Sequence, residues 1–136
     1  MTVVLATSLV IALYDADAPE HDAAAAWVLE ADEDLVTTPL AVAEMDAAVR
    51  REGGAAASER LWHDLDVGAF GVRWWADALT ETLGIVRRHP FLGLVDASLV
   101  ALAGRLRTDR IATFDQHFRS ITTLDGEPFV VLPADA

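Results

Sequence analysis

The sequence contains neither cysteine nor lysine. Without cysteine the chain cannot form a disulfide or a thiolate metal site, so we expect a reducing compartment, the cytoplasm. All ten basic residues are arginine, against 22 acidic residues, which gives a formal net charge of −12. Proteins that bind polyanions through charge alone depend on many basic side chains. Any nucleic-acid chemistry here would therefore depend on metal ions and a few local cations, and a basic protein is a suitable partner.

Long apolar runs are also missing. No segment approaches the roughly 18 consecutive apolar residues that span a bilayer, so we expect no membrane association. The first apolar run, residues 2–14, resembles a signal peptide but has no basic residues before it. With 136 residues, the chain is expected to form a single domain over residues 1–136.

Short apolar runs alternate with longer segments of helical periodicity. We expect strands at residues 3–5, 35–37, 111–113 and 129–132, with a weaker, glycine-broken strand within 67–72. We expect helices at residues 9–13, 21–30, 40–51, 55–65, 74–88 and 94–107. This alternation predicts an α/β fold, a three-layer α/β/α sandwich around a mostly parallel sheet of four to five strands with right-handed crossovers.

Two helix starts carry local signals. Thr7 or Ser8 is expected to cap the first helix through its hydroxyl group. Thr38 and Pro39 have the residue types of a helix cap and a first helical position.

Three acidic residues differ from the other nineteen by position. Glu44, Asp96 and Asp115 each follow a predicted strand or open a predicted helix among apolar neighbours. Burying one unpaired carboxylate costs several kcal/mol, and gathering several adds repulsion. A divalent cation removes both penalties, and hard oxygen ligands without a nearby Cys or His favour Mg²⁺ or Mn²⁺. The alternative is that these carboxylates only cap helices or face solvent.

Such a site suits phosphodiester hydrolysis, in which metal ions activate water and stabilise charge on the phosphate. Asp96 lies in the first turn of its predicted helix, where the helix dipole favours the ionised form. A phosphoryl-transfer site of the receiver or haloacid-dehalogenase type also uses Asp at strand ends. That type needs a Lys near the phosphate and an Asp on the first strand, and this chain has neither.

Four segments in order resemble the PIN domain of VapC-type toxins, the ribonuclease half of bacterial toxin–antitoxin pairs. They are residues 3–10, 38–44, 94–99 and 111–118, so the likeness covers nearly the whole chain. The resemblance implies a PIN-like sandwich in which Glu44, Asp96 and Asp115 are the catalytic acids that hold Mg²⁺ or Mn²⁺. Thr113 would lie in the accompanying strand-end motif, and Thr7 and Ser8 would support the site through hydrogen bonds.

One position departs from the family pattern. The family has an Asp immediately before Thr7 and Ser8, at the end of the first strand, whereas this chain has Ala6. Alanine cannot bind a metal, so one of four expected metal ligands is missing. Either the chain is a natural degenerate member, or the Asp was replaced to disarm a toxin; we favour the second reading because the other three acids remain. We therefore expect a weak or inactive nuclease with the native fold.

The resemblance also implies partners. They are RNA, a second copy of the chain in a homodimer, and a small basic antitoxin of the VapB type, in a heterotetramer or larger complex. The antitoxin tail would wrap the toxin and send an Arg into the acidic site. An alternative is a non-catalytic binding module that only sequesters the antitoxin, a reading that Ala6 favours.

Several other side chains are candidates for contacts. Arg87, Arg88 and Arg119 are candidates for RNA phosphates, with solvated surface charge as the alternative. The adjacent Trp74 and Trp75 cannot share one helix face, so at least one is a candidate for an interface. No His has the spacing of a metal site, and His117 is the one that could reach substrate.

The missing ligand gives a direct prediction. We expect Ala6→Asp to gain cleavage of structured RNA in Mg²⁺ or Mn²⁺, because the fourth carboxylate completes the cation site. The measurement is the rate of product formation with and without EDTA. If Ala6→Asp shows no more EDTA-sensitive cleavage than the chain with Ala6, the prediction is wrong.

Overall fold

The fold is built around a five-stranded sheet in which every neighbouring pair is parallel. The computed structural model describes all residues from Met1 to Ala136. The strand order is β3-β2-β1-β4-β5, so the first strand lies at the centre. The strands are β1 (Thr2–Leu5), β2 (Asp34–Thr37), β3 (Gly71–Val72), β4 (Arg110–Ala112) and β5 (Val130–Leu132). The predicted α/β class and the upper strand count are confirmed, and the sheet is wholly parallel.

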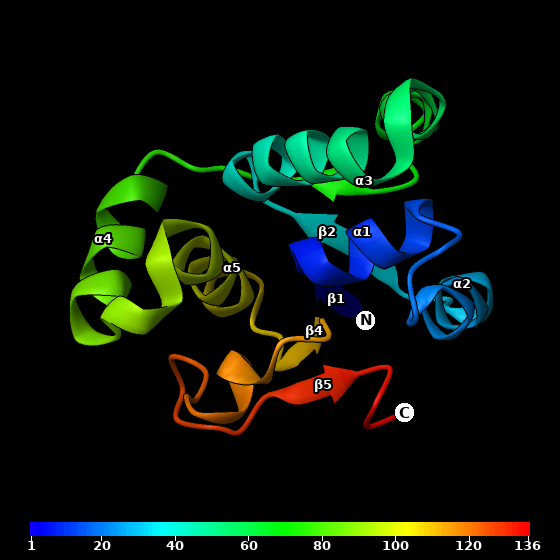
Figure 1. Cartoon of the computed structure of the whole chain (residues 1–136). Coiled ribbons are helices and arrows are strands. Elements are labelled where there is room, and N and C mark those ends of the chain that lie inside the picture. Colours follow the sequence, from blue (N-terminus) through cyan, green and yellow to red (C-terminus); the bar gives the residue numbers. More distant parts are fainter.

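Five helices connect these strands (Figure 1). They are α1 (Thr7–Tyr14), α2 (His21–Glu30), α3 (Pro39–Asp66), α4 (Ala78–Arg88) and α5 (Gly93–Leu106). Two short 3₁₀ helices, η1 (Pro90–Leu92) and η2 (Gln116–Arg119), complete the elements. The chain moves outward from β1 to β3 and then returns to β4, so right-handed crossovers put α4 and α5 on the face opposite α1, α2 and α3. No helix combines the length and the apolar character that crossing a bilayer requires.

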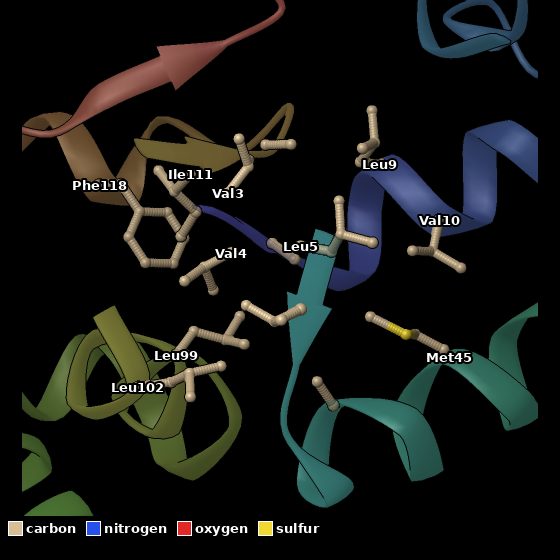
Figure 2. Packing of buried hydrophobic residues seen from close by; sticks show 14 of the residues in the cluster. Val3, Val4, Leu5, Leu9, Val10, Met45, Leu99, Leu102, Ile111 and Phe118 are labelled. Atoms are coloured by element: carbon tan, nitrogen blue, oxygen red, sulfur yellow. The ribbon is translucent and has the colours of Figure 1, made fainter. Parts of the chain in front are cut away.

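The core lies on both sides of β1. Leu99 and Leu102 of α5 approach the strands from one side, and Leu9 and Val10 of α1 lie on the other (Figure 2). All seven residues from Ala97 to Ala103 are buried, so α5 is covered all round. Helix α4 packs against α5 on the side away from the sheet and completes this burial.

Helix α3 contains the two helices that the sequence predicts around Gly53 and Gly54. Gly54 has φ 78° and ψ −172°, which breaks the helical path and changes its direction. A Cβ on Gly53 would lie 2.7 Å from Ala57 Cβ and 3.2 Å from the carbonyl oxygen of Tyr14. Glycine at position 53 therefore lets α3 approach α1 closely.

Two local predictions are wrong. Helix α4 begins at Ala78 rather than at residue 74, and Trp74 and Trp75 precede it. The Trp75 indole donates to Glu81 Oε2 at 2.9 Å and lies under the Arg105 guanidinium, so it packs back on the helices while Trp74 is 41% exposed.

The second wrong prediction concerns the first helix. Its N-cap is Ala6, and neither Thr7 nor Ser8 caps it, because both already lie inside α1. Thr38 does cap α3 as predicted, with its hydroxyl accepting from the backbone N–H of Ala41 at 3.2 Å.

An ion pair joins β4 to the loop before β2. Arg110 donates to both carboxylate oxygens of Glu33 at 2.7 Å. The side chains are 23% and 15% exposed, so water screens this pair less than a surface pair. The hydrogen bond from Arg110 lowers the pKa of Glu33 below its usual range. The pair lies at the amino ends of the strands.

We expect Glu33→Gln to lower the free energy of unfolding at neutral pH by about 1–2 kcal/mol, because Arg110 loses its charged acceptor. The folded-state pKa of Glu33 is depressed, so this contribution is present above about pH 5, where the unfolded carboxyl is ionised. It is lost as the pH falls below the ordinary titration range of glutamate, through the lowered folded-state pKa. Urea unfolding from pH 3 to pH 7 measures it. A difference between the two proteins that stays constant over this range would contradict the prediction.

Candidate functional site

The carboxyl ends of the neighbouring strands β2, β1 and β4 lie side by side. We call this end of the sheet its carboxyl edge. Ala6 follows β1 at this edge, and its N–H donates to the carbonyl oxygen of Ala112 at the end of β4 at 3.0 Å. On the other side of β1, the Thr37 hydroxyl donates to the carbonyl oxygen of Leu5 at 2.9 Å. The crossover from β1 to β2 and the crossover from β3 to β4 lie on opposite faces of the sheet, so the strand order reverses beside β1, and in open parallel sheets ligands bind at such a point.

Asp96, Asp115 and His117 lie together at this edge. Each offers one ligand atom, and the three atoms lie within 4.8 Å of one another. Asp96 comes from the first turn of α5, and its side chain is 15% exposed. His117 Nδ1 lies 3.3 Å from Asp96 Oδ2, and the His117 side chain is 48% exposed. Two residues 19 positions apart in the sequence, Asp96 and Asp115, are thus brought into one acidic group.

The charge of Asp96 is opposed by its surroundings. Burial raises the pKa of Asp96, and the neighbouring charges of Asp115 and Glu44 raise it further, although the hydrogen bond to His117 acts against them. The sequence predicted that the helix dipole favours ionised Asp96. The net shift of the Asp96 pKa is upward, and the negative charges of Asp115 and Glu44 that contribute to it favour a positive charge at this site.

Glu44 lies near this group but not within it. Its charge acts on Asp96, yet it is not one of the three residues whose ligand atoms lie within 4.8 Å of one another. Its sequence neighbours are apolar as described, but Ala41 and Met45 are the residues of this turn that face the core. Glu44 is exposed on α3 beside them.

A hydrogen-bond network fixes the segment that carries Asp115. Ser8 Oγ lies 3.0 Å from Thr113 Oγ1 and accepts from the N–H of Phe114 at 2.9 Å. Thr113 Oγ1 accepts from the N–H of Asp115 at 3.0 Å. Thr113 is 1% exposed, so these bonds are shielded from water. The network ties α1 to the chain after β4 and sets the direction in which Asp115 leaves the strand.

A second pair of hydroxyl groups holds α3 against α5. Thr38 Oγ1 lies 2.8 Å from Ser98 Oγ, and Ser98 donates to the carbonyl oxygen of Val95 at 2.6 Å. Both residues are fully buried. They fix the start of α3, which carries Glu44, relative to the turn of α5 that carries Asp96.

Position 6 lacks a polar group although it adjoins the acidic edge. Ala6 is 1% exposed and occupies the N-cap of α1 without a side-chain cap. The next residue, Thr7, is 7% exposed and its hydroxyl has no hydrogen-bond partner. The start of α1 therefore has no side-chain cap, and the neighbouring Thr7 hydroxyl has no hydrogen-bond partner. A polar side chain at position 6 would suit these surroundings.

The three arginine candidates differ. Arg87 and Arg88 are exposed in the last turn of α4 and form no ion pair. Arg119 donates to both oxygens of Asp135 at 2.7 and 2.8 Å, so it is already paired. Arg119 and the N–H of Val131 lower the pKa of Asp135 to about 2.

Sequence reasoning missed His117 as a member of the acidic group. The signal was its place two residues after Asp115 in a short polar turn after a strand. The spacing lacks the regular pattern of a histidine metal site, and the 3₁₀ turn of η2 is what directs His117 back toward Asp96.

Comparisons with known proteins match most of the chain. The PIN domain family model matches residues 3–124. Ribonuclease VapC26 of Mycobacterium tuberculosis (strain ATCC 25618 / H37Rv) is 31% identical over 134 residues, covering 96% of this chain and 99% of that protein. Ribonuclease VapC29 of Mycobacterium tuberculosis (strain CDC 1551 / Oshkosh) is 31% identical over 137 residues, with 98% of each chain covered. The crystal structure of Mycobacterium tuberculosis VapC20, titled a Sarcin-Ricin loop cleaving toxin, superposes with a TM-score of 0.78 at 20% identity. It covers 87% of this chain and 93% of that one, and this likeness shows the fold.

The network around Thr113 gives a test of how the site is held. We expect Thr113→Val to lower the free energy of unfolding by about 1–3 kcal/mol, because the buried N–H of Asp115 and the Ser8 hydroxyl lose a partner. Thr113→Ser keeps the hydroxyl and is the matched control, with a loss below about 1 kcal/mol. Urea denaturation measures both. No loss in Thr113→Val, or a loss in Thr113→Ser at least as large as that in Thr113→Val, would contradict the role assigned to the hydroxyl.

Proposed function

Since this chain belongs to the PIN domain family of VapC ribonucleases, we propose that it is the toxin of a type II toxin–antitoxin pair, with the fold of a metal-dependent endoribonuclease. Its substrate class is RNA, whose phosphodiester bonds it would hydrolyse. The observation that carries the proposal is the convergence of Asp96, Asp115 and His117 at the carboxyl edge of a parallel sheet, beside the end of the central strand. The single-domain organisation over residues 1–136 is part of the same proposal.

The donor set fits a divalent cation. Asp96 and Asp115 would hold it, with Glu44 adding negative charge from α3 and His117 offering a nitrogen ligand. The raised pKa of Asp96 reflects burial beside two negative charges, which a cation would offset. When bound, the cation supplies the positive charge that activates water and stabilises charge building up on the attacked phosphate. Mg²⁺ and Mn²⁺ both suit carboxylate oxygens, and the imidazole nitrogen favours Mn²⁺ over Mg²⁺.

The chain's own residues orient the reacting groups. Asp96 is held by α5, whose buried Ala97–Ala103 segment fixes its axis. Asp115 is held by the bonds of Thr113 to its backbone, and Thr113 is held by Ser8. Arg87 and Arg88 are free to bind phosphates of the RNA, whereas Arg119 would have to leave Asp135 first.

Ala6 makes this chain a weak or inactive form. An Asp at this position would cap α1 and add a fourth carboxylate at the end of β1. Alanine does neither, so cation binding rests on fewer oxygens. Catalysis should suffer more than folding, because the core around position 6 is complete.

The proposed protein partner is a small basic antitoxin of the VapB type, with a homodimer of this chain in a heterotetramer or larger complex. The net charge of −12 favours a basic partner. The acidic group would accept an Arg from the antitoxin tail as a substitute for the cation. If restoring Asp at position 6 gives no cleavage while a basic peptide still binds tightly, the chain is instead a binding module that sequesters its partner.

The proposed function is tested by removing one carboxylate of the acidic group, that of Asp96, from the Ala6→Asp variant. In the Ala6→Asp background, we expect Asp96→Asn to reduce Mn²⁺-dependent RNA cleavage by at least about a hundredfold, because a buried cation ligand is lost. Asp125→Asn, a change in an exposed loop, is the matched control and should keep the activity.

Unfolding is separated from lost catalysis by a melting curve in EDTA. Burial raises the pKa of Asp96, so its ionised form destabilises the metal-free protein at neutral pH, and the neutral amide should leave the melting temperature equal or higher. Mn²⁺ should raise the melting temperature of Ala6→Asp and have less effect on the double variant. Cleavage that survives Asp96→Asn would refute the proposed site.

A further inference from the structure

An exposed aromatic ring lies next to the acidic group. Phe91, in η1, is 53% exposed, although its neighbour Leu92 is 6% exposed and anchors the turn in the core. The Phe91 ring lies between two histidine rings in edge-to-face contacts. The ring centroids are 6.0 Å apart for His89 and 6.1 Å apart for His117, with interplanar angles of 73° and 88°.

The ring is held in place by a short, hydrogen-bonded turn. The N–H of His89 donates to the carbonyl oxygen of Ile85 at 2.9 Å, and the N–H of Leu92 donates to that of His89 at 3.0 Å. Pro90 fixes one backbone angle between them. An aromatic ring on such a turn loses little conformational freedom when a ligand covers it.

His117 connects this ring directly to the acidic group. Its ring contacts Phe91, and its Nδ1 lies 3.3 Å from Asp96 Oδ2. A ligand group that covers Phe91 is therefore one imidazole ring away from Asp96. Single exposed apolar residues are common and need no explanation, so the position of Phe91 beside the acidic group is what distinguishes it.

Positive charge lies just before this turn in the chain. Arg87 and Arg88 end α4, are exposed and have no acidic partner. They precede Phe91 closely in the sequence and bring two unpaired guanidinium groups to this part of a chain of net charge −12. The segment from Arg87 to Leu92 thus combines an aromatic face with phosphate-binding groups, the combination that single-stranded nucleic acids require.

We propose that Phe91 is the stacking platform for an unpaired base of the RNA, next to the phosphodiester whose hydrolysis the acidic group would support. This inference rests on the proposed function and adds to it the side chain on which an unpaired base would stack. Base-paired RNA presents no free base face at this position, whereas splayed-out bases stack on aromatic side chains. Phe91 binds the base. His117 contacts both the Phe91 ring and Asp96, so it holds these two side chains in a fixed relative position.

The test measures binding rather than cleavage, so it uses the chain with Ala6 as it is. The probe is an RNA hairpin whose unpaired loop carries the fluorescent base 2-aminopurine, titrated at low salt in the presence of Mn²⁺. Stacking on Phe91 should change the fluorescence of the loop base. We expect Phe91→Ala to weaken binding by about 5- to 100-fold, from the usual strength of base–aromatic stacking. Phe91→Trp keeps an aromatic face and should bind within about threefold of the original.

The matched control is Leu124→Ala. Leu124 is 49% exposed and lies against Gly104, toward the other end of α5 from Asp96. Its loss removes a similar apolar surface away from the site and should leave RNA affinity unchanged. A fully base-paired RNA of the same length should bind equally weakly to the original chain and to Phe91→Ala.

Three outcomes would refute the proposal that Phe91 stacks on an unpaired base. They are equal affinity of Phe91→Ala and the original chain, equal losses in Phe91→Ala and Leu124→Ala, and a loss in Phe91→Trp as large as that in Phe91→Ala. An Arg-rich peptide whose affinity depends on Phe91 while that of RNA does not would assign the ring to a protein partner instead. Because no cleavage is measured, failure of Ala6→Asp to cut RNA would refute the proposed activity and leave this binding result standing.

Discussion

The repulsion among carboxylates at the carboxyl edge of the sheet is the constraint on which the rest of the structure depends. Asp96 is mostly buried and lies in the fields of Asp115 and Glu44, so its ionised form is disfavoured where it stands. Favourable contacts elsewhere in the chain must offset this free-energy cost of placing ionised Asp96 in the folded state. The seven consecutive buried residues of α5 and the hydroxyl pairs Ser8–Thr113 and Thr38–Ser98 surround the acidic edge and hold it together. The charge that disfavours folding is the same charge that would recruit a cation.

Position 6 has two structural roles. It ends the central strand and occupies the cap of the first helix, and an aspartate suits both because its carboxylate can accept a backbone N–H and bind a cation. Compared with aspartate, alanine provides no side-chain cap for α1. It also removes one negative charge from an edge that already holds several carboxylates. These two effects on stability oppose each other. Loss of activity at this position is therefore compatible with an intact fold.

The fold and the acidic positions were predictable where local signals agreed with tertiary structure. Alternating strands and helices gave the parallel sheet, and Thr38 and Pro39 gave the start of α3. The start of α4 was not predictable, because the apolar run through Trp74 and Trp75 has helical periodicity yet bends back onto Arg105 and Glu81. His117 was missed because the 3₁₀ turn that directs it to Asp96 has no strong local code. The exposure of Glu44 depends on which side of α3 the core selects, and only the packed helix shows it.

The C-terminal turn is connected to the acidic edge through Arg119. Asp135 accepts two bonds from Arg119 and one from the N–H of Val131, so the turn after β5 and the end of η2 are fastened to each other. η2 also carries His117. Loss of the Asp135 carboxylate would therefore release the Arg119 guanidinium and free the end of η2, the element whose imidazole contacts Asp96.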